Sequence, residues 1–434
     1  MRKIVFFEKD FAFIIVGLLI CRGLGLIPTQ TQATITKSGY DLIIITSADF
    51  SNEVQPLVIH KEQHGIATKI ITLDDIYNGI YFDEQGRDDA EKIKFFIKNA
   101  YDFWNISYVL FIGDTYKIPF RLCNTNVIEN MTLLFTSELY YADIYDANGD
   151  FSSWDSDEDG IYGEWYFGAI AEDKNIDLKP DIAVGRIPCT FPIEVKIIVN
   201  KIIQYEITAA DPSWFKKLVV AGGDGFIEYP GNEGEIMTQN VIDVMTGFTP
   251  VKLWVSTGAI DPFGISIMKA INQGCGFLYM AGHGNWWIWA ANANDLVGFF
   301  PIFRMPLLRN HNKYPICVTT GCHNSKIEKS CWSWHMLKQP FGGSIATMGS
   351  TSVGYSGLEY GGGGIDWLEL HFFTEYSKGT DILGKIWKNV ITSYVSNFSI
   401  DWEIPAGENC AIDAKMVQEW IILGDPTLKI GGYS

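Results

Sequence analysis

Short apolar runs recur along the chain and predict β-strands. They are rich in β-branched residues and apolar at consecutive positions, which is typical of strands buried on both faces of a sheet. Longer stretches with apolar side chains at helical spacing lie between them. We expect strands at 40–46, 67–71, 108–112, 182–184, 217–221, 276–280, 316–320 and 344–348, and helices at 54–64, 90–104 and 192–207. This alternation predicts an α/β fold with mostly parallel sheets flanked by helices.

A polar stretch at 209–213 marks the clearest domain boundary, because it follows the long helix and precedes a new strand. The chain has 434 residues, and at about 150 residues per domain this length suggests two or three domains. We therefore expect two α/β subdomains, an N-terminal one at 37–210 and a C-terminal one at 214–434.

Residues 1–33 have the shape of a signal peptide. Arg2 and Lys3 precede an apolar run at 11–20, and residues 31–33 offer a small-x-small cleavage site. The run is short for a bilayer span, and an uncleaved N-terminal anchor is the alternative interpretation. Both place the chain outside the cytoplasm, secreted or at the cell surface. No other stretch is long and apolar enough to cross a membrane, so we expect no span in the mature chain unless this segment stays uncleaved.

The composition narrows the class of protein. Apolar residues make up 47% of the chain and charged residues 19%, which excludes a disordered chain. The net charge of -18 repels phosphate, so nucleic acid is not an expected partner. One of the eight cysteines lies in the leader, and the odd number that remains predicts a free, reactive thiol.

Two predicted strands end in reactive side chains. His283 follows the strand at 276–280 within Gly-His-Gly, and Cys322 follows the strand at 316–320. The carboxyl ends of parallel strands are where α/β folds place their chemistry. A cysteine and a separate histidine act as nucleophile and base when the fold brings them together. Their spacing suits two neighbouring strands joined by a crossover.

A zinc site is the alternative use of these residues. Cys317, Cys322, His323, Cys331 and His335 form a Cys/His-rich patch with near-zinc spacing. However, strand alternation would place residues 317 and 322 on opposite faces, which argues against shared ligation.

An acidic stretch at 143–164 predicts a calcium site. Alternate carboxylates on a tight loop present hard oxygen ligands to Ca²⁺, and a glycine permits the sharp turn. The candidate ligands are Asp146, Asn148, Asp150, Asp155, Asp157 and Asp159. The stretch is not an EF-hand, because the twelfth position counted from Asp155 is Tyr166. A solvated acidic loop is the alternative.

A set of short motifs resembles one family in its order along the chain. The motifs are YDLIIIT at 40–46, YVLFIGD at 108–114, DIAVGRIP at 181–188, GHG at 282–284, the cysteine at 322, GGSIATMGST at 342–351 and LGDP at 423–426. They are similar to those of gingipain-type cysteine peptidases, family C25 of the caspase-like clan. The resemblance covers nearly all of the mature chain.

The resemblance implies a caspase/gingipain-like fold and endopeptidase activity on protein or peptide substrates. It assigns Cys322 as the nucleophile and His283 as the acid/base partner, in a Cys–His dyad. The backbone N–H groups of Cys322 and Gly284 are the expected oxyanion donors. An alternative is a catalytically silent C25-like domain that acts as a surface binding or adhesion module, since residues 323–326 match no motif of the family. A zinc hydrolase is the third interpretation.

The resemblance also suggests a basic specificity. Ser137-Glu138 stands where arginine-specific gingipains have a Ser-Asp pair that holds the P1 arginine. We therefore expect Glu138 to pair with a basic P1 side chain, Arg or Lys, and Tyr355 and Ser356 to form walls of the same pocket. The alternative is that Glu138 serves the neighbouring acidic loop or a helix N-terminus.

Overall fold

The computed structural model describes residues 39–129, 134–224, 231–293, 296–357, 363–407 and 409–433. The predicted leader at 1–33 lies outside these residues. Residues Lys37–Ser434 group into one compact unit, and the following description concerns that unit.

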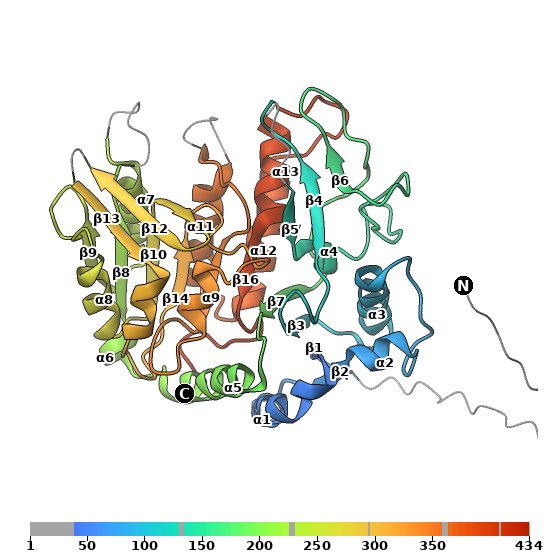
Figure 1. Cartoon of the computed structure of the whole chain (residues 1–434), viewed down its shortest axis with the longest axis horizontal. Helices are drawn as coiled ribbons and strands as arrows, with labels where there is room; N and C mark the ends of the chain where they lie inside the picture. The colour runs from blue at the N-terminus through green and yellow to red at the C-terminus, as the bar shows by residue number, and fades with distance from the viewer. Residues whose placement is uncertain are drawn as a thin grey trace, which may run out of the picture. The chain divides into compact units, whose positions relative to one another are not determined.

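One sheet of ten described strands forms the centre of the fold (Figure 1). Its order is β2-β1-β3-β7-β16-β15-β14-β10-β8-β9, and every neighbouring pair is parallel except β15 with β16. The strands are β1 (Leu42–Thr46), β2 (Thr68–Thr72), β3 (Tyr108–Ile112), β7 (Ala183–Ile187), β8 (Lys217–Gly222), β9 (Thr249–Trp254), β10 (Phe277–Ala281), β14 (Ile316–Thr319), β15 (Ala346–Ser350) and β16 (Trp420–Leu423). In the order of the sheet, β2, β1, β3, β7 and β16 therefore run in one direction, and β15, β14, β10, β8 and β9 run in the opposite direction.

This sheet contains all eight strands expected from the sequence, and the predicted mostly parallel α/β fold is confirmed. The two expected subdomains share the sheet without a break between them. Their junction is the antiparallel pair β15 and β16, and β16 comes from the end of the chain although it pairs with β7 of the N-terminal half. The boundary at 209–213 falls between helix α5 and strand β8.

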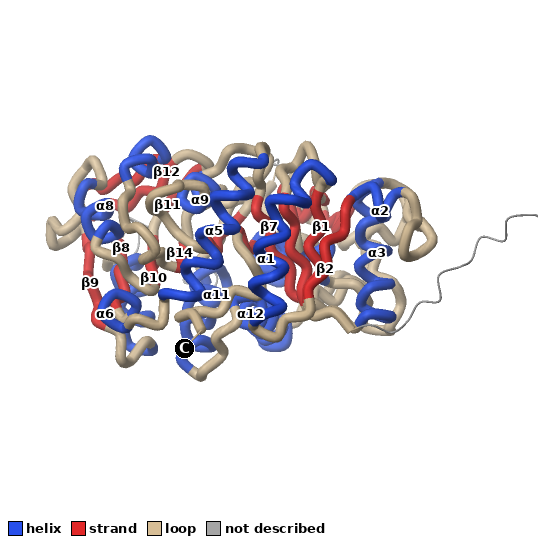
Figure 2. The backbone as a smooth tube through the Cα atoms, turned by 90° about the horizontal axis from the view of Figure 1, so that it is seen from below, coloured by secondary structure: helices blue, strands red, loops and turns tan. Residues whose placement is uncertain are grey.

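Helices cover both faces of the sheet. On one face α1 packs on α5, and α8 and α9 both pack on the 3-10 helix η2 (Figure 2). On the other face α11 packs on both α7 and α12, and α12 packs on α13. The helices are α1 (Ser51–Gln63), α2 (Leu73–Tyr77), α3 (Asp89–Trp104), α4 (Leu139–Ala142), α5 (Pro192–Thr208), α6 (Pro212–Phe215), α7 (Glu233–Val244), α8 (Ile265–Asn272), α9 (Trp332–Leu337), α11 (Gly364–Ser377), α12 (Leu383–Asn397) and α13 (Asn409–Glu419), with 3-10 helices η1 (Ala48–Phe50) and η2 (Ile302–Leu307).

Strand alternation divides the core of the C-terminal half between the two faces. Leu278 and Met280 of β10 belong to one buried cluster with Trp332 of α9. Phe277 and Tyr279 point the other way, where their rings lie 5.7 and 5.4 Å from the ring of Phe373 on α11. The central strands are therefore buried on both faces, which explains their uninterrupted apolar runs.

Two small sheets complete the described fold. One is the antiparallel set β11 (His283–Asn285), β12 (Ile288–Ala293) and β13 (Leu296–Pro301), which follows directly after β10. The other contains β4 (Arg121–Thr125), β5 (Phe135–Ser137) and β6 (Tyr162–Trp165). Among the described residues, no helix has the length and apolar character needed to span a bilayer.

Candidate functional site

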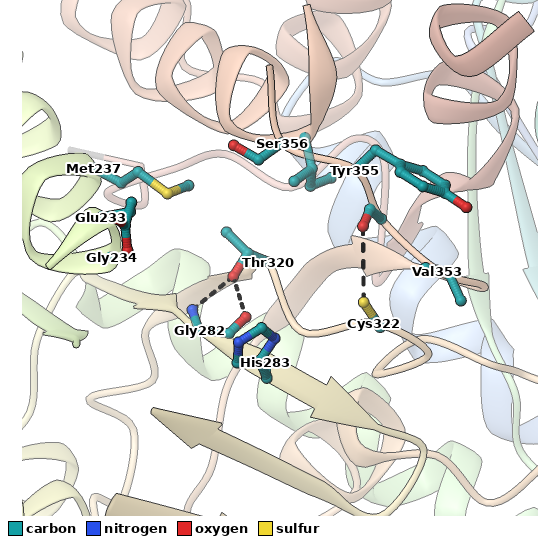
Figure 3. Close-up of a pocket in the computed structure, with 12 residues that line it drawn as sticks. Glu233, Gly234, Met237, Gly282, His283, Thr320, Cys322, Val353, Tyr355 and Ser356 are labelled. Carbon is teal, nitrogen blue, oxygen red and sulfur yellow. Dashed lines mark hydrogen bonds between the residues drawn. The ribbon is translucent and has the colours of Figure 1, made fainter. Parts of the chain in front are cut away.

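His283 and Cys322 line the same cavity, which has a volume of about 270 Å³ (Figure 3). The other lining residues are Glu233, Gly234, Met237, Gly282, Thr320, Val353, Gly354, Tyr355, Ser356 and Ile365. Figure 3 shows Thr320 beside Gly282 and His283. Glu233 and Met237 lie on the side of the cavity away from Cys322 and Tyr355. The fold therefore brings together a cysteine and a histidine that lie far apart in the sequence.

Strand pairing explains why the two side chains meet. Strands β10 and β14 are parallel neighbours whose last paired positions are Met280 and Thr319. His283 lies three residues after Met280, and Cys322 lies three residues after Thr319. Both therefore emerge at the same edge of the sheet, as parallel strands require.

The Thr320 side chain fixes the turn that precedes His283. Its hydroxyl donates to the Gly282 carbonyl oxygen at 2.6 Å, and it accepts the Gly282 N–H at 2.7 Å. This double contact joins the end of β14 to the end of β10. The backbone that presents His283 is therefore held against the strand that presents Cys322.

Asn324 makes a second connection between the two reactive segments. Its buried side-chain amide donates from Nδ2 to the carbonyl oxygens of Asn285 at 2.8 Å and Ile288 at 3.1 Å. Its Oδ1 accepts the Thr319 hydroxyl at 3.0 Å. The loop after Cys322 thus holds the β11–β12 hairpin on which His283 lies. In the sequence, Asn324 falls within the 323–326 loop, which matches no motif of the family, so its role was not predicted.

The Cys322 thiol is half-buried, and its Sγ lies 3.9 Å from the Gly354 carbonyl oxygen. Burial raises the pKa of Cys322 above its ordinary value of 9.0, although the Gly354 contact and the charge of Lys415 lower it in part. A thiol with a raised pKa is protonated at neutral pH, and only the thiolate is strongly nucleophilic. Cys322 therefore needs a base, and His283 lies in the same cavity.

The segment 353–356 forms one wall of the cavity and includes Tyr355 and Ser356, the two residues expected there. Lys415 holds this wall, because its Nζ donates to the Val353 carbonyl oxygen at 2.7 Å. Lys415 is itself fully buried and forms an ion pair with Glu419. Segment 353–356 is therefore held by a hydrogen bond from Lys415, which belongs to a buried ion pair within α13.

The N-terminal turn of α7 supplies the acidic group of the cavity. Glu233, Gly234 and Met237 line it, and Glu233 is the acidic residue among the described lining residues. Gly234 lets the helix approach closely, since a Cβ there would lie 2.6 Å from the Ala281 carbonyl oxygen of β10. Nothing near Glu233 in the sequence signals a site.

The expectation that Glu138 lines the specificity pocket is corrected by the structure. Glu138 is absent from the cavity lining, is 1% exposed and accepts a 2.7 Å hydrogen bond from Arg186 Nε. A second Arg186 nitrogen lies 3.3 Å from its other oxygen. Arg186 sits on β7, so this acid neutralises a buried arginine within the N-terminal half instead of facing a substrate.

Gly284, the other expected oxyanion donor, is not among the lining residues. Its backbone is close to the nucleophile loop, since a Cβ at this position would lie 2.7 Å from both Gly321 Cα and Asn324 Nδ2. Glycine is therefore required where the hairpin meets the segment that leads to Cys322.

The structure separates the expected metal ligands into two sets. Asp155, Asp157 and Asp159 offer carboxylate oxygens within 4.8 Å of one another, and Asp157 forms a second such group with Glu164 and Glu172. In contrast, Asp146, Asn148 and Asp150 form a separate turn, in which Asp146 Oδ1 accepts the other two backbone N–H groups at 2.9 Å each.

No metal-binding group among the described residues includes a cysteine or histidine, so the zinc alternative has no geometric support. All seven described cysteines are free thiols, and Cys317 and Cys331 are fully buried.

Comparisons with known proteins agree with this geometry. The model of peptidase family C25 matches residues 35–431. Gingipain R2 of Porphyromonas gingivalis is 21% identical over 407 residues, which cover 91% of this chain and 46% of that protein. An uncharacterized protein of Archaeoglobus fulgidus is 24% identical over 369 residues, covering 75% of this chain and 78% of the relative. The chain thus spans less than half the length of the gingipain relative.

Two solved structures share the fold. The crystal structure of the Arg-specific cysteine proteinase gingipain R superposes with a TM-score of 0.66 at 18% identity, covering 91% of this chain and 79% of the other. A complex of the pro- and mature domains of RgpB from Porphyromonas gingivalis gives a TM-score of 0.64 at 16% identity, with coverages of 90% and 79%. The expected gingipain-like architecture is therefore confirmed.

Proposed function

The chain belongs to peptidase family C25, and on this basis we propose that it is a cysteine endopeptidase in which Cys322 is the nucleophile and His283 the acid/base. The observation that carries the proposal is the shared cavity at the ends of β10 and β14, which both side chains line. A raised thiol pKa gives the histidine a defined task, since the thiol must lose its proton before it reacts.

The proposed reaction has two halves. His283 takes the Cys322 proton as the sulfur attacks the scissile carbonyl carbon, and a tetrahedral oxyanion forms. The C–N bond then breaks while His283 gives the proton to the leaving amine, which leaves a thioester on Cys322. A water molecule, deprotonated by His283, attacks the thioester and releases the acid and the free enzyme.

Backbone N–H groups are the proposed donors to the oxyanion. Cys322 supplies one, and Gly284 remains the candidate for the second because its backbone lies against the Gly321 segment. Donors that are fixed before the reaction stabilise the developing charge without reorganisation.

We further propose a preference for a basic P1 side chain, with Glu233 as its partner instead of Glu138. Glu233 lines the cavity that holds Cys322, and it enters from the side opposite Tyr355 (Figure 3). A long cationic side chain that crosses this cavity would meet a carboxylate there. The similarity to a structure described as an Arg-specific proteinase supports the same preference.

Hydrolysis of a mixed fluorogenic peptide library tests the dyad. Cys322→Ala and His283→Ala should each lower kcat/KM by about 10³-fold or more, because nucleophile and base act as one unit. Cys317→Ala is the matched control, since this buried thiol lies inside β14 away from the cavity and should leave turnover largely intact. An inactive native chain would favour the surface-binding alternative. Loss of activity in Cys317→Ala, with activity retained in Cys322→Ala, would refute the assignment of Cys322 as the nucleophile.

Cleavage-site profiling tests the specificity. Glu233→Gln should remove the preference for Arg or Lys at P1 while Cys322 stays alkylatable at neutral pH. Glu138→Gln should lower the melting temperature and leave the P1 preference unchanged, because its partner is Arg186. If Glu233→Gln instead abolishes alkylation, Glu233 acts on the dyad and not on P1. An apolar or acidic preference in the native enzyme would refute the basic pocket.

Export is a further part of the proposal and rests on the leader-like sequence at 1–33. Expression in a secreting host followed by N-terminal sequencing tests it. A mature chain that begins directly after residue 33 supports a cleaved signal peptide. A chain that retains Arg2 and Lys3 and sediments with membranes supports the anchor, and an intact cytoplasmic chain contradicts both.

A further inference from the structure

An apolar groove lies beside the hairpin that carries His283. It has a volume of about 400 Å³, and aromatic side chains from separate segments line it. Phe263 precedes α8, Trp287 lies between β11 and β12, and Phe303 belongs to η2. These three side chains are 65%, 39% and 64% exposed. The other lining residues are Pro262, Ile288, Phe299, Pro301 and Arg304. Large aromatic side chains that gather on a surface and stay this exposed indicate a binding site.

The groove and His283 share one face of the small β11–β12–β13 sheet. Residues paired directly across an antiparallel sheet project to the same face, and successive residues along a strand alternate between faces. His283 pairs with Ala290, which pairs with Phe299. Trp289 and Phe300, which pair with each other, are fully buried on the other face. The outer face therefore begins at His283 and continues into the groove at Phe299.

The groove extends away from Cys322. Cys322 follows β14 and His283 follows β10, and the next strands of the central sheet in that direction are β8 and β9. Strand β13 lies against the segment that follows β9, because a Cβ at Gly264 would lie 2.3 Å from the Phe299 carbonyl oxygen. The direction from Cys322 to His283 therefore continues across the small sheet into the groove.

The proposed mechanism places the leaving half of the substrate on this side. His283 gives its proton to the leaving amine, so the substrate residues that follow the scissile bond begin at His283. Two strand spacings of about 4.8 Å each separate His283 from Phe299, and an extended chain advances about 3.3 Å per residue. A side chain two to four residues after the scissile bond would therefore reach the groove.

We propose that the groove is a subsite for the leaving half of the substrate, and that it binds a large apolar or aromatic side chain two to four residues after the scissile bond. Its role rests on the proposed peptidase function, because the dyad defines where the scissile bond lies. Such a side chain would remove the exposed rings of Phe263 and Phe303 from water. Arg304 is the charged residue among the described residues of the lining, so a Lys or Arg side chain would be repelled there.

Hydrolysis of internally quenched peptides by the full chain tests the subsite. The peptides share the residues before the scissile bond and carry Phe, Ser or Lys at the second, third or fourth residue after it. We expect kcat/KM to be about tenfold higher for Phe than for Ser at one or more of these positions, because an aromatic side chain becomes buried, and to be lowest for Lys. Equal values for Phe and Ser at all three positions would overturn the proposal.

Paired variants locate the subsite. Phe263→Ser removes one wall of the groove and should abolish the preference for Phe. This variant should still hydrolyse a peptidyl coumarylamide at the native rate, because that substrate has no residue after the scissile bond. Phe191→Ser is the matched control, since Phe191 is 61% exposed before α5 and does not line the groove. A preference that survives Phe263→Ser, or an equal loss in Phe191→Ser, would contradict the assigned groove, as would loss of coumarylamide turnover in Phe263→Ser.

Peptide binding to Cys322→Ala separates the groove from the peptidase activity. Fluorescence anisotropy measures the affinity for uncleaved peptides, and the Phe peptide should bind about tenfold more tightly than the Ser peptide. Turnover by the native chain without this preference would refute the groove alone. Preferential binding without turnover would support the groove and contradict the proposed peptidase. A concentration-dependent dimer that Phe263→Ser abolishes would show that a second copy covers the groove, and would overturn the proposal.

Discussion

The reactivity of Cys322 depends on its neighbours more than on its residue type. Seven described thiols are free, yet burial raises the pKa of Cys123, Cys275 and Cys331 to about 12 and leaves them inert. Cys322 is half-exposed to a cavity that also contains an imidazole. In the proposed mechanism, transfer of the Cys322 proton to that imidazole converts a weak nucleophile into a strong one.

This dependence predicts how alkylation varies with pH. With the imidazole removed in His283→Ala, the Cys322 thiol keeps a pKa above 9.0, so at pH 7 less than about 1% is thiolate. We expect iodoacetamide to label Cys322 at least about tenfold more slowly in this variant at pH 7, with the rate rising as pH increases through 9. Mass spectrometry of the Cys322 peptide measures the rate of labelling, and Cys317→Ala is the control. Identical pH profiles in the native chain and His283→Ala would contradict the pairing.

At the scale of elements, the β11–β12 hairpin carries His283, and the loop after β14 carries Cys322. Register alone brings the two segments to one edge of the sheet, but side chains set their final distance. Thr320 joins the strand ends. Asn324 accepts the hydroxyl of Thr319 at the end of β14 and donates across the gap to the hairpin. Because both contacts are buried or half-buried, they are expected to be rigid.

Asn324→Asp tests this element-level contact. The change keeps the shape of the side chain but places a carboxylate oxygen where an N–H faced two carbonyl oxygens, at 2.8 and 3.1 Å in the native chain. We expect the hairpin to shift and kcat to fall by about 10²-fold, as for small displacements of catalytic groups, while KM changes little. Alkylation of Cys322 at pH 7 should slow in parallel. Asn285→Ala, which alters an exposed side chain on the same hairpin, should keep both rates.

At the scale of the whole molecule, buried cations hold distant segments together. Lys61 of α1 forms 2.8 Å ion pairs with Glu206 of α5 and Asp425 near the C-terminus. Lys201 of α5 donates to four backbone carbonyl oxygens, those of Leu337, Gln339, Gly342 and Ser344. The Lys201 contacts connect the N-terminal half with the segment that leads into β15, across the antiparallel junction of the sheet.

Lys201→Met should therefore destabilise the whole unit. Methionine fills a similar volume but removes the N–H donors that these four carbonyl oxygens share, and each buried hydrogen bond lost costs about 1–3 kcal/mol. We expect the free energy of unfolding to fall by at least about 3 kcal/mol in urea titrations. Lys196→Met, on the exposed side of the same helix, should change it by about 0.5 kcal/mol or less. Equal effects of the two substitutions would refute the role of Lys201.

The sequence failed to predict two strands of the sheet, for identifiable reasons. Strand β9 (Thr249–Trp254) lies at the sheet edge with partly exposed residues and includes Pro250, so its apolar pattern is broken. Strand β16 (Trp420–Leu423) is short and follows α13 without an intervening loop, so its apolar residues read as a continuation of the helix. Its position between β7 and β15 depends on pairing with segments far away in the chain.

The sequence by itself determined eight of the central strands and the α/β class, and it singled out Cys322 and His283 as candidates. Those features follow from local periodicity and from residue type, which neighbouring positions specify. Only the tertiary structure decided which acid shares the cavity: Glu233 lines it, while Glu138 pairs with Arg186. It also decided that Asp157 meets Glu164 and Glu172 and not Asp146. The choice of partner for a charged side chain depends on long-range packing and burial, and no local pattern in the sequence encodes that.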